Sequence, residues 1–518
     1  MKIFKNKSIF TLAAILLFNI AFFAIIANVF PIRFEENDDV LMASIANGTY
    51  LGEPDCHLVY MNALYGSFLV MLYRICPIVE WYTYLLAFFQ VVSITVASYY
   101  TIKDVKSKVL KISLLFTLYS LWSYVIFFLQ YTTVAGLLAF ASVILFHKKH
   151  FYLAGIFFCL SVLVRYHCAG MVFILSVPIL IYEYGKEWKN YLKVGAVLAF
   201  AGLLYLGNNA FYQEKEWKEY KEYNEIRGKI ADNPNKEKCK LELLKIMSES
   251  DFILICYFFH DPDVMTVDLL RQMYGIIESN NIENKFMNVT ANFISKYKVL
   301  IGLFFFLIVF IVVFRKDKRI VILSLSSFLL WLLLVGYISL NSWPKYRVVI
   351  SSILLLWYVV VVGSITIKNH FRIALLSSLL IVGGYIVFVR EIRGGAPFRK
   401  QVEYSVHDEQ TKILRKIENK RMVPFCTDLR IEYYSPFKLK DNFSNNRIVF
   451  LGWLAKYPLK GGYFTYRDFK KDDVLLFASK KYDSAPLQQS MREHYGLDTD
   501  TIHVKESENY ALIKFVQK

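Results

Sequence analysis

Long apolar blocks, separated by short polar segments, occupy most of the first 389 residues. Uninterrupted apolar stretches of this kind predict helices that cross a bilayer. The predicted spans are about 9–30, 81–101, 110–129, 131–147, 151–166, 168–183, 192–208, 298–314, 319–340, 346–367 and 371–389. The pattern therefore predicts an α-helical polytopic membrane protein with about 11 transmembrane helices.

Two long stretches lack this apolar pattern and are predicted to be soluble. In the first, 209–297, a charged helix with an aromatic edge starts near Glu214, and a second helix is expected at about 240–258. The second stretch, 390–518, holds short alternating runs that are typical of a small mixed α/β domain. The predicted organisation is a transmembrane domain at 1–389, with outer loops at 31–80 and 209–297, and an extracytoplasmic C-terminal α/β domain at 390–518.

The block His57–Ile75 is apolar enough to span, so two topologies compete. If it spans, the lysines at 103–111 lie outside; if it lies along the outer surface, they lie inside. With the block flat, the basic clusters at 148–149, 186–193, 315–319 and 368–372 all fall on the same side as the N-terminal lysines. Lys and Arg concentrate in cytoplasmic loops. The charges favour the flat placement, a cytoplasmic N-terminus and a multi-pass protein of the cell membrane.

The overall composition agrees with a membrane protein. Hydrophobic residues make up 56% of the 518 and charged residues 20%, against about 25% charged in soluble domains. The formal net charge of +17 lies largely in short loops, where it sets topology. It is not interleaved with the aromatic platforms that single-strand binders use, so no nucleic-acid partner is expected.

Four carboxylates, Glu35, Glu36, Asp38 and Asp39, follow the first span almost at once. Acids are costly near a bilayer and mark candidate functional sites. One alternative is structural: Asn37 or Asp38 caps a short helix, and the acids complement its dipole. The other is chemical: a partly desolvated carboxylate has a raised pKa suited to accepting a proton. Both remain open on these residues alone.

Other candidate site residues lie at predicted outer ends of the spans. Asp55 and His57 close the acidic loop and could add a second acid and a proton shuttle or metal ligand, or simply loop polarity. The basic candidates are Arg165, His167, Lys345 and Arg347. They could anchor the spans at the interface, but their position outside opposes the prevailing charge bias. Cations beside acids suit a substrate that carries a lipid phosphate.

The order of these features resembles the GT-C class of integral-membrane glycosyltransferases, which includes protein O-mannosyltransferases and aminoarabinose transferases. The resemblance rests on Asp38-Asp39, a short helix ending at Gly48, the block His57–Ile75 and the span from Trp81. It implies that Asp38 is the catalytic carboxylate, Asp39 its partner, and Lys345 and Arg347 the basic residues that begin a late span. The chain departs from the class in lacking a His-Pro-Pro-Leu-like segment before the surface helix and a W-W-D-type sequence.

The resemblance implies transfer of a sugar from a polyprenyl-phosphate donor to a glycan, lipid or protein acceptor on the outer face of the bilayer. Arg165, Lys345 and Arg347 would then bind the phosphate. Two alternatives stay open: a polymerase or ligase of cell-surface polysaccharide, and a flippase or transporter of lipid-linked sugars. No cofactor is expected; a divalent metal is compatible with the acids, but no ligand spacing supports one.

Overall fold

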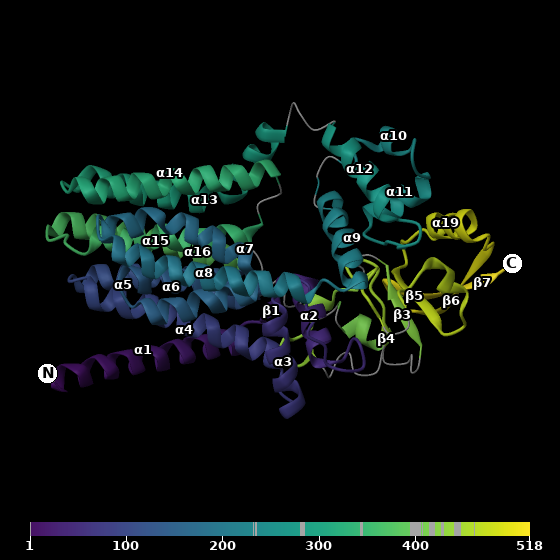
Figure 1. Cartoon of the computed structure of the whole chain (residues 1–518), viewed down its shortest axis with the longest axis horizontal. Coiled ribbons are helices and arrows are strands. Elements are labelled where there is room, and N and C mark those ends of the chain that lie inside the picture. Colours follow the sequence, from purple (N-terminus) through teal and green to yellow (C-terminus); the bar gives the residue numbers. More distant parts are fainter. Residues whose placement is uncertain are drawn as a thin grey trace.

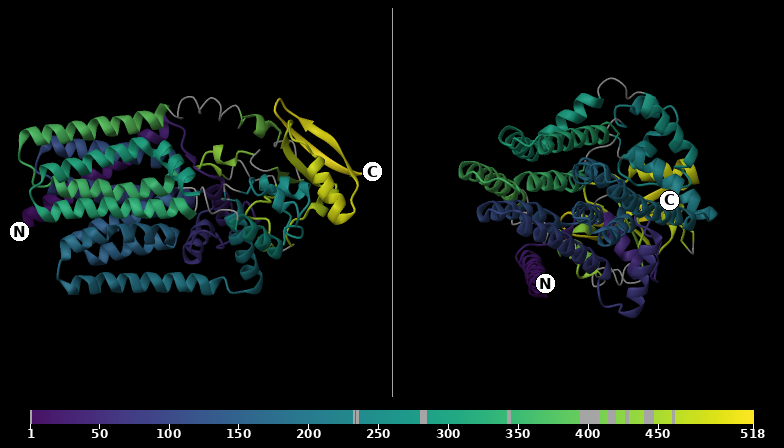
Figure 2. Two further views of the ribbon diagram at one scale, coloured as in Figure 1. Left: turned by 90° about the horizontal axis from the view of Figure 1, so that it is seen from above. Right: turned by 60° about the vertical axis from the view of Figure 1, so that its left-hand side comes forward.

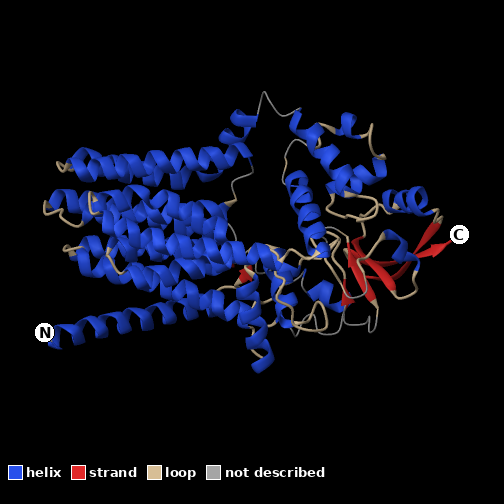
Figure 3. Cartoon of the chain, viewed as in Figure 1, coloured by secondary structure: helices blue, strands red, loops and turns tan. Residues whose placement is uncertain are grey.

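The computed structural model describes residues 2–518 except 232, 234–235, 280–284, 342–344, 394–405, 407, 414–419, 426–428, 440–446 and 460–461. Long helices run side by side in a bundle, and a soluble part of short helices and strands sits at one end of it (Figure 1). The N-terminus lies at the opposite end of the bundle, and the C-terminus lies in the soluble part (Figure 2). Strands are confined almost entirely to the soluble part (Figure 3).

The bundle is built from the apolar segments. Its helices are α1 (Lys2–Val29), α4 (Trp81–Asp104), α5 (Lys108–Phe127), α6 (Tyr131–His147), α7 (Phe151–Tyr184), α8 (Trp188–Phe211), α13 (Lys285–Phe314), α14 (Lys318–Asn341), α15 (Tyr346–Ser364) and α16 (His370–Arg393). Among the described residues, nine helices are long and apolar enough to cross a membrane. The chain is therefore a multi-pass membrane protein. The α15 helix is almost fully buried at the centre, whereas α1 and α8 lie on the rim.

The α7 helix reverses direction at Arg165, whose backbone is extended (φ −161°, ψ 96°). Rings on its two arms meet: Phe158 and Phe173 are 5.8 Å apart, and Phe151 and Tyr184 are 6.1 Å apart. A straight helix would separate the latter pair by roughly 50 Å. The arms match the two predicted spans 151–166 and 168–183. Each of the eleven predicted segments is thus a helix or a helix arm, while the number of crossings stays a prediction.

The ambiguous block forms α3 (Ala63–Ile75), which lies across the direction of the bundle helices beside the short α2 (Asn37–Asn47) (Figure 1). With 13 residues, α3 is roughly 20 Å long, too short to cross a bilayer. Its exposed apolar side chains follow helical spacing: Leu64, Phe68, Met71 and Ile75. These features agree with the flat placement.

The first soluble stretch begins with α9 (Lys215–Ala231), as expected from its charge pattern. The helix expected at about 240–258 is instead two helices, α10 (Lys240–Leu243) and α11 (Glu249–Cys256). The interruption has a local cause, because the Ser248 hydroxyl accepts a hydrogen bond from the Asp251 amide at 3.2 Å and starts a new helix. The α12 helix (Val267–Ser279) follows.

The C-terminal tail forms a mixed sheet, as predicted. Its strands are β3 (Arg421–Pro424), β4 (Arg447–Ile448), β5 (Val474–Ser479), β6 (Thr499–Glu506) and β7 (Tyr510–Gln517), in the order β4-β3-β5-β7-β6. The first three are parallel, and β7 and β6 add on antiparallel. The helix α19 (Ala485–Tyr495) is tied to α11, since the Ser490 hydroxyl donates to the Asp251 carboxylate at 2.7 Å. The tail and the large loop therefore form one soluble part.

Candidate functional site

A cavity of about 630 Å³ lies where the bundle meets the soluble part. Its walls come from segments far apart in sequence: α2, the loop before α3, the turn of α7, the end of α8, α9, the start of α15, and the C-terminal tail. Five of the eight predicted site residues line it: Asp38, Arg165, His167, Lys345 and Arg347. The predicted acid and the predicted cations thus share one cavity.

Two local features place Asp38 at the cavity wall. A short parallel ladder pairs β1 (Arg33–Phe34) with β2 (Phe128–Leu129), which fixes the chain just before α2. The N-cap of α2 is Glu36, which makes no side-chain capping bond, so Asp38 lies inside the first helical turn rather than capping it. The helix ends at Gly48 in the left-handed region (φ 85°), where a Cβ would lie 2.7 Å from the Glu53 carbonyl carbon.

Asp39 faces away from the cavity and is fully buried. One carboxylate oxygen accepts a hydrogen bond from the Tyr82 hydroxyl at 2.8 Å and another from the Tyr131 amide at 3.0 Å. Burial raises the pKa of Asp39 well above its ordinary value, against the effect of both donors. Asp39 therefore holds α2 against α4 and α6 and sets the direction in which Asp38 points.

Asp38 keeps partial exposure toward the cavity. Burial raises its pKa, and the charge of Glu36 raises it further, whereas the positive charges of Arg347, Lys345 and Arg227 lower it. Arg347 has the largest of these lowering effects. The carboxylate is thus more basic than an ordinary aspartate but lies among cations that keep its charged form accessible.

The cations approach from two elements of the bundle. Arg347, at the start of α15, is 8% exposed, and its guanidinium lies 3.1 Å from the Glu36 carboxylate. Lys345 is the N-cap of the same helix. Arg165, at the α7 turn, donates to the Tyr60 carbonyl at 3.1 Å and lies over the Tyr60 and Tyr131 rings at 5.4 and 5.5 Å. The His167 ring lines the wall beside this turn.

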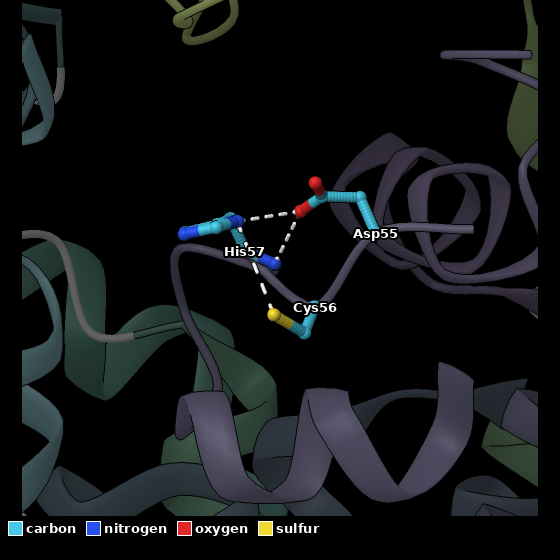
Figure 4. Close-up of side chains that lie close together, drawn as sticks. All are labelled: Asp55, Cys56 and His57. Carbon is cyan, nitrogen blue, oxygen red and sulfur yellow. Dashed lines mark hydrogen bonds and ion pairs between the residues drawn. The ribbon is translucent and has the colours of Figure 1, made fainter. Parts of the chain in front are cut away.

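Asp55 and His57 lie elsewhere and do not belong to the described cavity lining. One oxygen of Asp55 accepts hydrogen bonds from the His57 ring and backbone nitrogens, both at 2.7 Å (Figure 4). Burial opposes a charge on His57, but the Asp55 contact outweighs it and raises the pKa of His57 to about 9. The ring stacks on Trp217 at 4.1 Å, and the Tyr457 hydroxyl donates to the His57 carbonyl at 3.0 Å. The pair joins the first outer loop to α9 and the tail.

Two described groups bring three potential metal ligands within 4.8 Å of one another: Asp55, Cys56 and His57, and Asp251, Glu493 and His494. The His57 ring already bonds to Asp55. Asp251 likewise accepts from Ser490 at 2.7 Å and pairs with His494 at 2.8 Å. Both groups have a structural explanation and lie outside the cavity lining.

The contribution of α9 to the cavity was not predicted from the sequence. Lys221, Asn224 and Arg227 line the cavity from this helix, because α9 buries one face rather than lying in solvent. A signal was available: Trp217 and Tyr220 form an aromatic edge at helical spacing, and Arg227 continues the same stripe. The tail residue Trp453 was also missed; its ring lies 5.0 Å from that of Tyr60.

Taken together, the cavity holds a basic carboxylate opposite several cations. Such a carboxylate can take a proton from a hydroxyl or an amine. Arginine and lysine can bind a phosphate and stabilise negative charge that develops on a leaving group.

Comparisons with known proteins give one distant structural match. No family model matches the sequence, and no curated protein sequence matches it. Among solved structures, the chain is similar to ArnT from Cupriavidus metallidurans in the apo state, with 10% sequence identity and a TM-score of 0.41. The match covers 95% of this chain and 97% of that one. At this score the likeness carries no function across, so the case for function rests on the cavity and the residues around it.

Proposed function

We propose that the protein is a membrane glycosyltransferase that moves a sugar from a polyprenyl-phosphate-linked donor to an acceptor on the outer face of the membrane. Asp38 takes a proton from a hydroxyl or amine of a glycan, lipid or protein acceptor. The acceptor atom then attacks the anomeric carbon, with inversion. The bond from that carbon to the phosphate oxygen breaks, and polyprenyl phosphate leaves with the electron pair.

The observation that carries the proposal is the gathering of Asp38, Arg165, Lys345 and Arg347 around one cavity. The carboxylate has a raised pKa, which suits a general base. The cations suit a bound phosphate and its developing charge in the transition state. Asp39 acts here as a positioning residue, and His167 as a wall of the donor site.

The surface of α8 supports a lipid-linked donor. Its C-terminal end contributes Tyr205, Asn208 and Asn209 to the cavity. The turns next to them expose apolar side chains on the bundle rim, including Leu203 and Leu206. An isoprenoid chain lying along this rim would stay in the bilayer while its phosphate reaches the cavity.

Replacement of Asp38 tests the proposal. We expect Asp38→Asn to lower turnover by about 10²–10⁴-fold, because the amide cannot accept the proton. Cells in which the variant replaces the native copy should accumulate a polyprenyl-phosphate monosaccharide, measured by mass spectrometry of the lipid-linked pool. Asp268→Asn is the matched control. Asp268 is exposed on α12, so this substitution removes the same charge outside the cavity lining.

Three results would contradict the proposal. Normal activity of Asp38→Asn, at equal protein level in the membrane, would remove Asp38 as the base. Accumulation of oligosaccharide-lipid instead of monosaccharide-lipid would indicate a polysaccharide polymerase or ligase. Binding of the lipid-linked sugar without turnover, together with its movement across vesicle membranes, would indicate a transporter.

A further inference from the structure

Arg227 is a buried cation in the cavity wall whose bonds end on a neutral group. It is 8% exposed and lines the cavity from α9. Its Nε and one terminal nitrogen both donate to the Asn224 side-chain oxygen, at 3.1 and 2.9 Å. Among the described residues, no carboxylate lies within ion-pair distance of it.

Of the other cavity arginines, two have a carboxylate partner, and Arg165, which has none among the described residues, is only partly buried. The guanidinium of Arg347 has the Glu36 carboxylate at 3.1 Å, and that of Arg430 has the Glu432 carboxylate at 3.5 Å. A buried charge without a counter-charge is strongly destabilising. The structure thus holds a cation that is oriented by two bonds to Asn224 and has no described carboxylate in ion-pair contact. The Asp38 carboxylate interacts with it only at longer range, so an anion bound in direct contact would offset its burial more fully.

Arg227 enters the cavity from a different element than the side chains assigned to the donor phosphate. Arg227 comes from the large soluble loop, whereas Arg165, Lys345 and Arg347 come from the bundle. Tyr60 is near both sets of cations: its carbonyl accepts a hydrogen bond from Arg165, and the positive charges of Arg165 and Arg227 both lower the pKa of its hydroxyl, against the larger effect of burial.

We propose that Arg227 binds a second anionic group of a substrate, a phosphate or a carboxylate, in addition to the phosphate of the donor. The inference rests on the proposed function and extends it to the substrate class. The planar guanidinium suits such oxyanions because it can donate two parallel hydrogen bonds. The second anion belongs either to the donor, as the outer phosphate of a diphosphate-linked lipid, or to an acidic acceptor.

Binding of inorganic phosphate to protein that is loaded with undecaprenyl phosphate, the lipid carrier that leaves in the proposed reaction, tests this inference. The full-length protein in lipid nanodiscs is saturated with undecaprenyl phosphate, and binding of radiolabelled inorganic phosphate is measured by equilibrium dialysis. We expect the wild type to bind phosphate. Arg227→Gln should bind it more weakly by about tenfold or more, because a charge-assisted hydrogen bond is lost. Arg271→Gln is the matched control, since Arg271 is exposed on α12 of the same loop.

A second variant keeps the arginine. Asn224→Asp has nearly the same shape but supplies a carboxylate at the atom that Arg227 already contacts, so it should also weaken phosphate binding by tenfold or more. Unchanged phosphate binding in both variants, or no phosphate binding by the carrier-loaded wild type, would overturn the inference. Failure of the wild type to bind undecaprenyl phosphate would instead count against the proposed function, and the Arg227 comparison would then be made on the unloaded protein.

A last arm identifies the source of the anion. Undecaprenyl diphosphate replaces undecaprenyl phosphate in the same assay. If the diphosphate displaces inorganic phosphate, Arg227 binds the second phosphate of the donor. If inorganic phosphate still binds, the subsite takes an acidic group of the acceptor.

Discussion

Two adjacent carboxylates, Asp38 and Asp39, have opposite surroundings because neighbours on a helix point about 100° apart. Asp39 points into the protein and bonds to Tyr82 and Tyr131. Asp38 points toward the cavity and the cations around it. Asp39 therefore shapes the site, and Asp38 is the carboxylate that we propose reacts.

The pH dependence of turnover should report Asp38. A base must be deprotonated, so kcat/KM should rise with pH through the pKa of Asp38. That midpoint should lie above the usual aspartate value of about 4, because burial raises the pKa. Arg347 lowers it, so Arg347→Gln should move the midpoint to higher pH in a kcat/KM profile of the purified protein.

Arg165→Gln is the control for this shift. Arg165 lines the cavity but is not among the main influences on the pKa of Asp38. Its loss should weaken turnover and leave the midpoint unchanged. A midpoint that stays fixed in Arg347→Gln, or moves to lower pH, would rule out Asp38 as the titrating base.

At the residue scale, the position of a site residue could be predicted where the neighbouring segment of the chain determines it. Asp38 follows a span directly, and Lys345 and Arg347 begin one, so their depth in the membrane could be inferred. Asp55 and His57 occupy a similar place in sequence, yet they bond to each other and to Trp217. Arg227 was not predicted, because the aromatic stripe of α9 indicates which face is buried but not that this face lines the cavity.

At the scale of elements, the length of the apolar segments predicted where the membrane helices lie, but not how the chain turns between them. The two arms of α7 were expected as separate spans, yet no turn residues or Gly separate them. A single extended residue, Arg165, makes the reversal. The prediction of one helix at 240–258 was wrong because Ser248 starts a new helix inside this range. Local capping and turn geometry decide such points, and hydropathy does not report them.

The reversal of α7 can be measured as a distance. Tyr152 and Ile181 are exposed on its two arms, so spin labels there should not disturb the core. In a straight helix they would be roughly 44 Å apart. The hairpin predicts a separation below about 20 Å by double electron–electron resonance, given arms packed at the usual 8–10 Å between helix axes. A distance near 40 Å would contradict the hairpin.

At the scale of the whole molecule, the cavity exists because three distant parts of the chain meet: the helix bundle, the large loop and the C-terminal tail. Hydrogen bonds hold them together: the Thr83 hydroxyl donates to the Pro436 carbonyl at 2.6 Å, and the Tyr220 hydroxyl donates to the Trp453 carbonyl at 2.9 Å. The sequence predicted each part. It also predicted that the acids after the first span lie beside the cations at the ends of other bundle helices. It did not predict that α9 and the tail would complete the walls, because the periodic stripe of α9 indicates a buried face but not which distant segment packs on it.

The orientation of the molecule follows from where its charges lie. The basic loops at 148–149, 186–193, 315–319 and 368–372 lie at the end of the bundle opposite the cavity. Because Lys and Arg in short loops stay in the cytoplasm, we expect the cavity to face outward. In a cysteine-free background, a membrane-impermeant maleimide should label Arg271→Cys on intact cells and Lys186→Cys only after permeabilisation. The reverse pattern would place Asp38 on the cytoplasmic side, where an outer-face transfer from a polyprenyl-phosphate sugar is impossible.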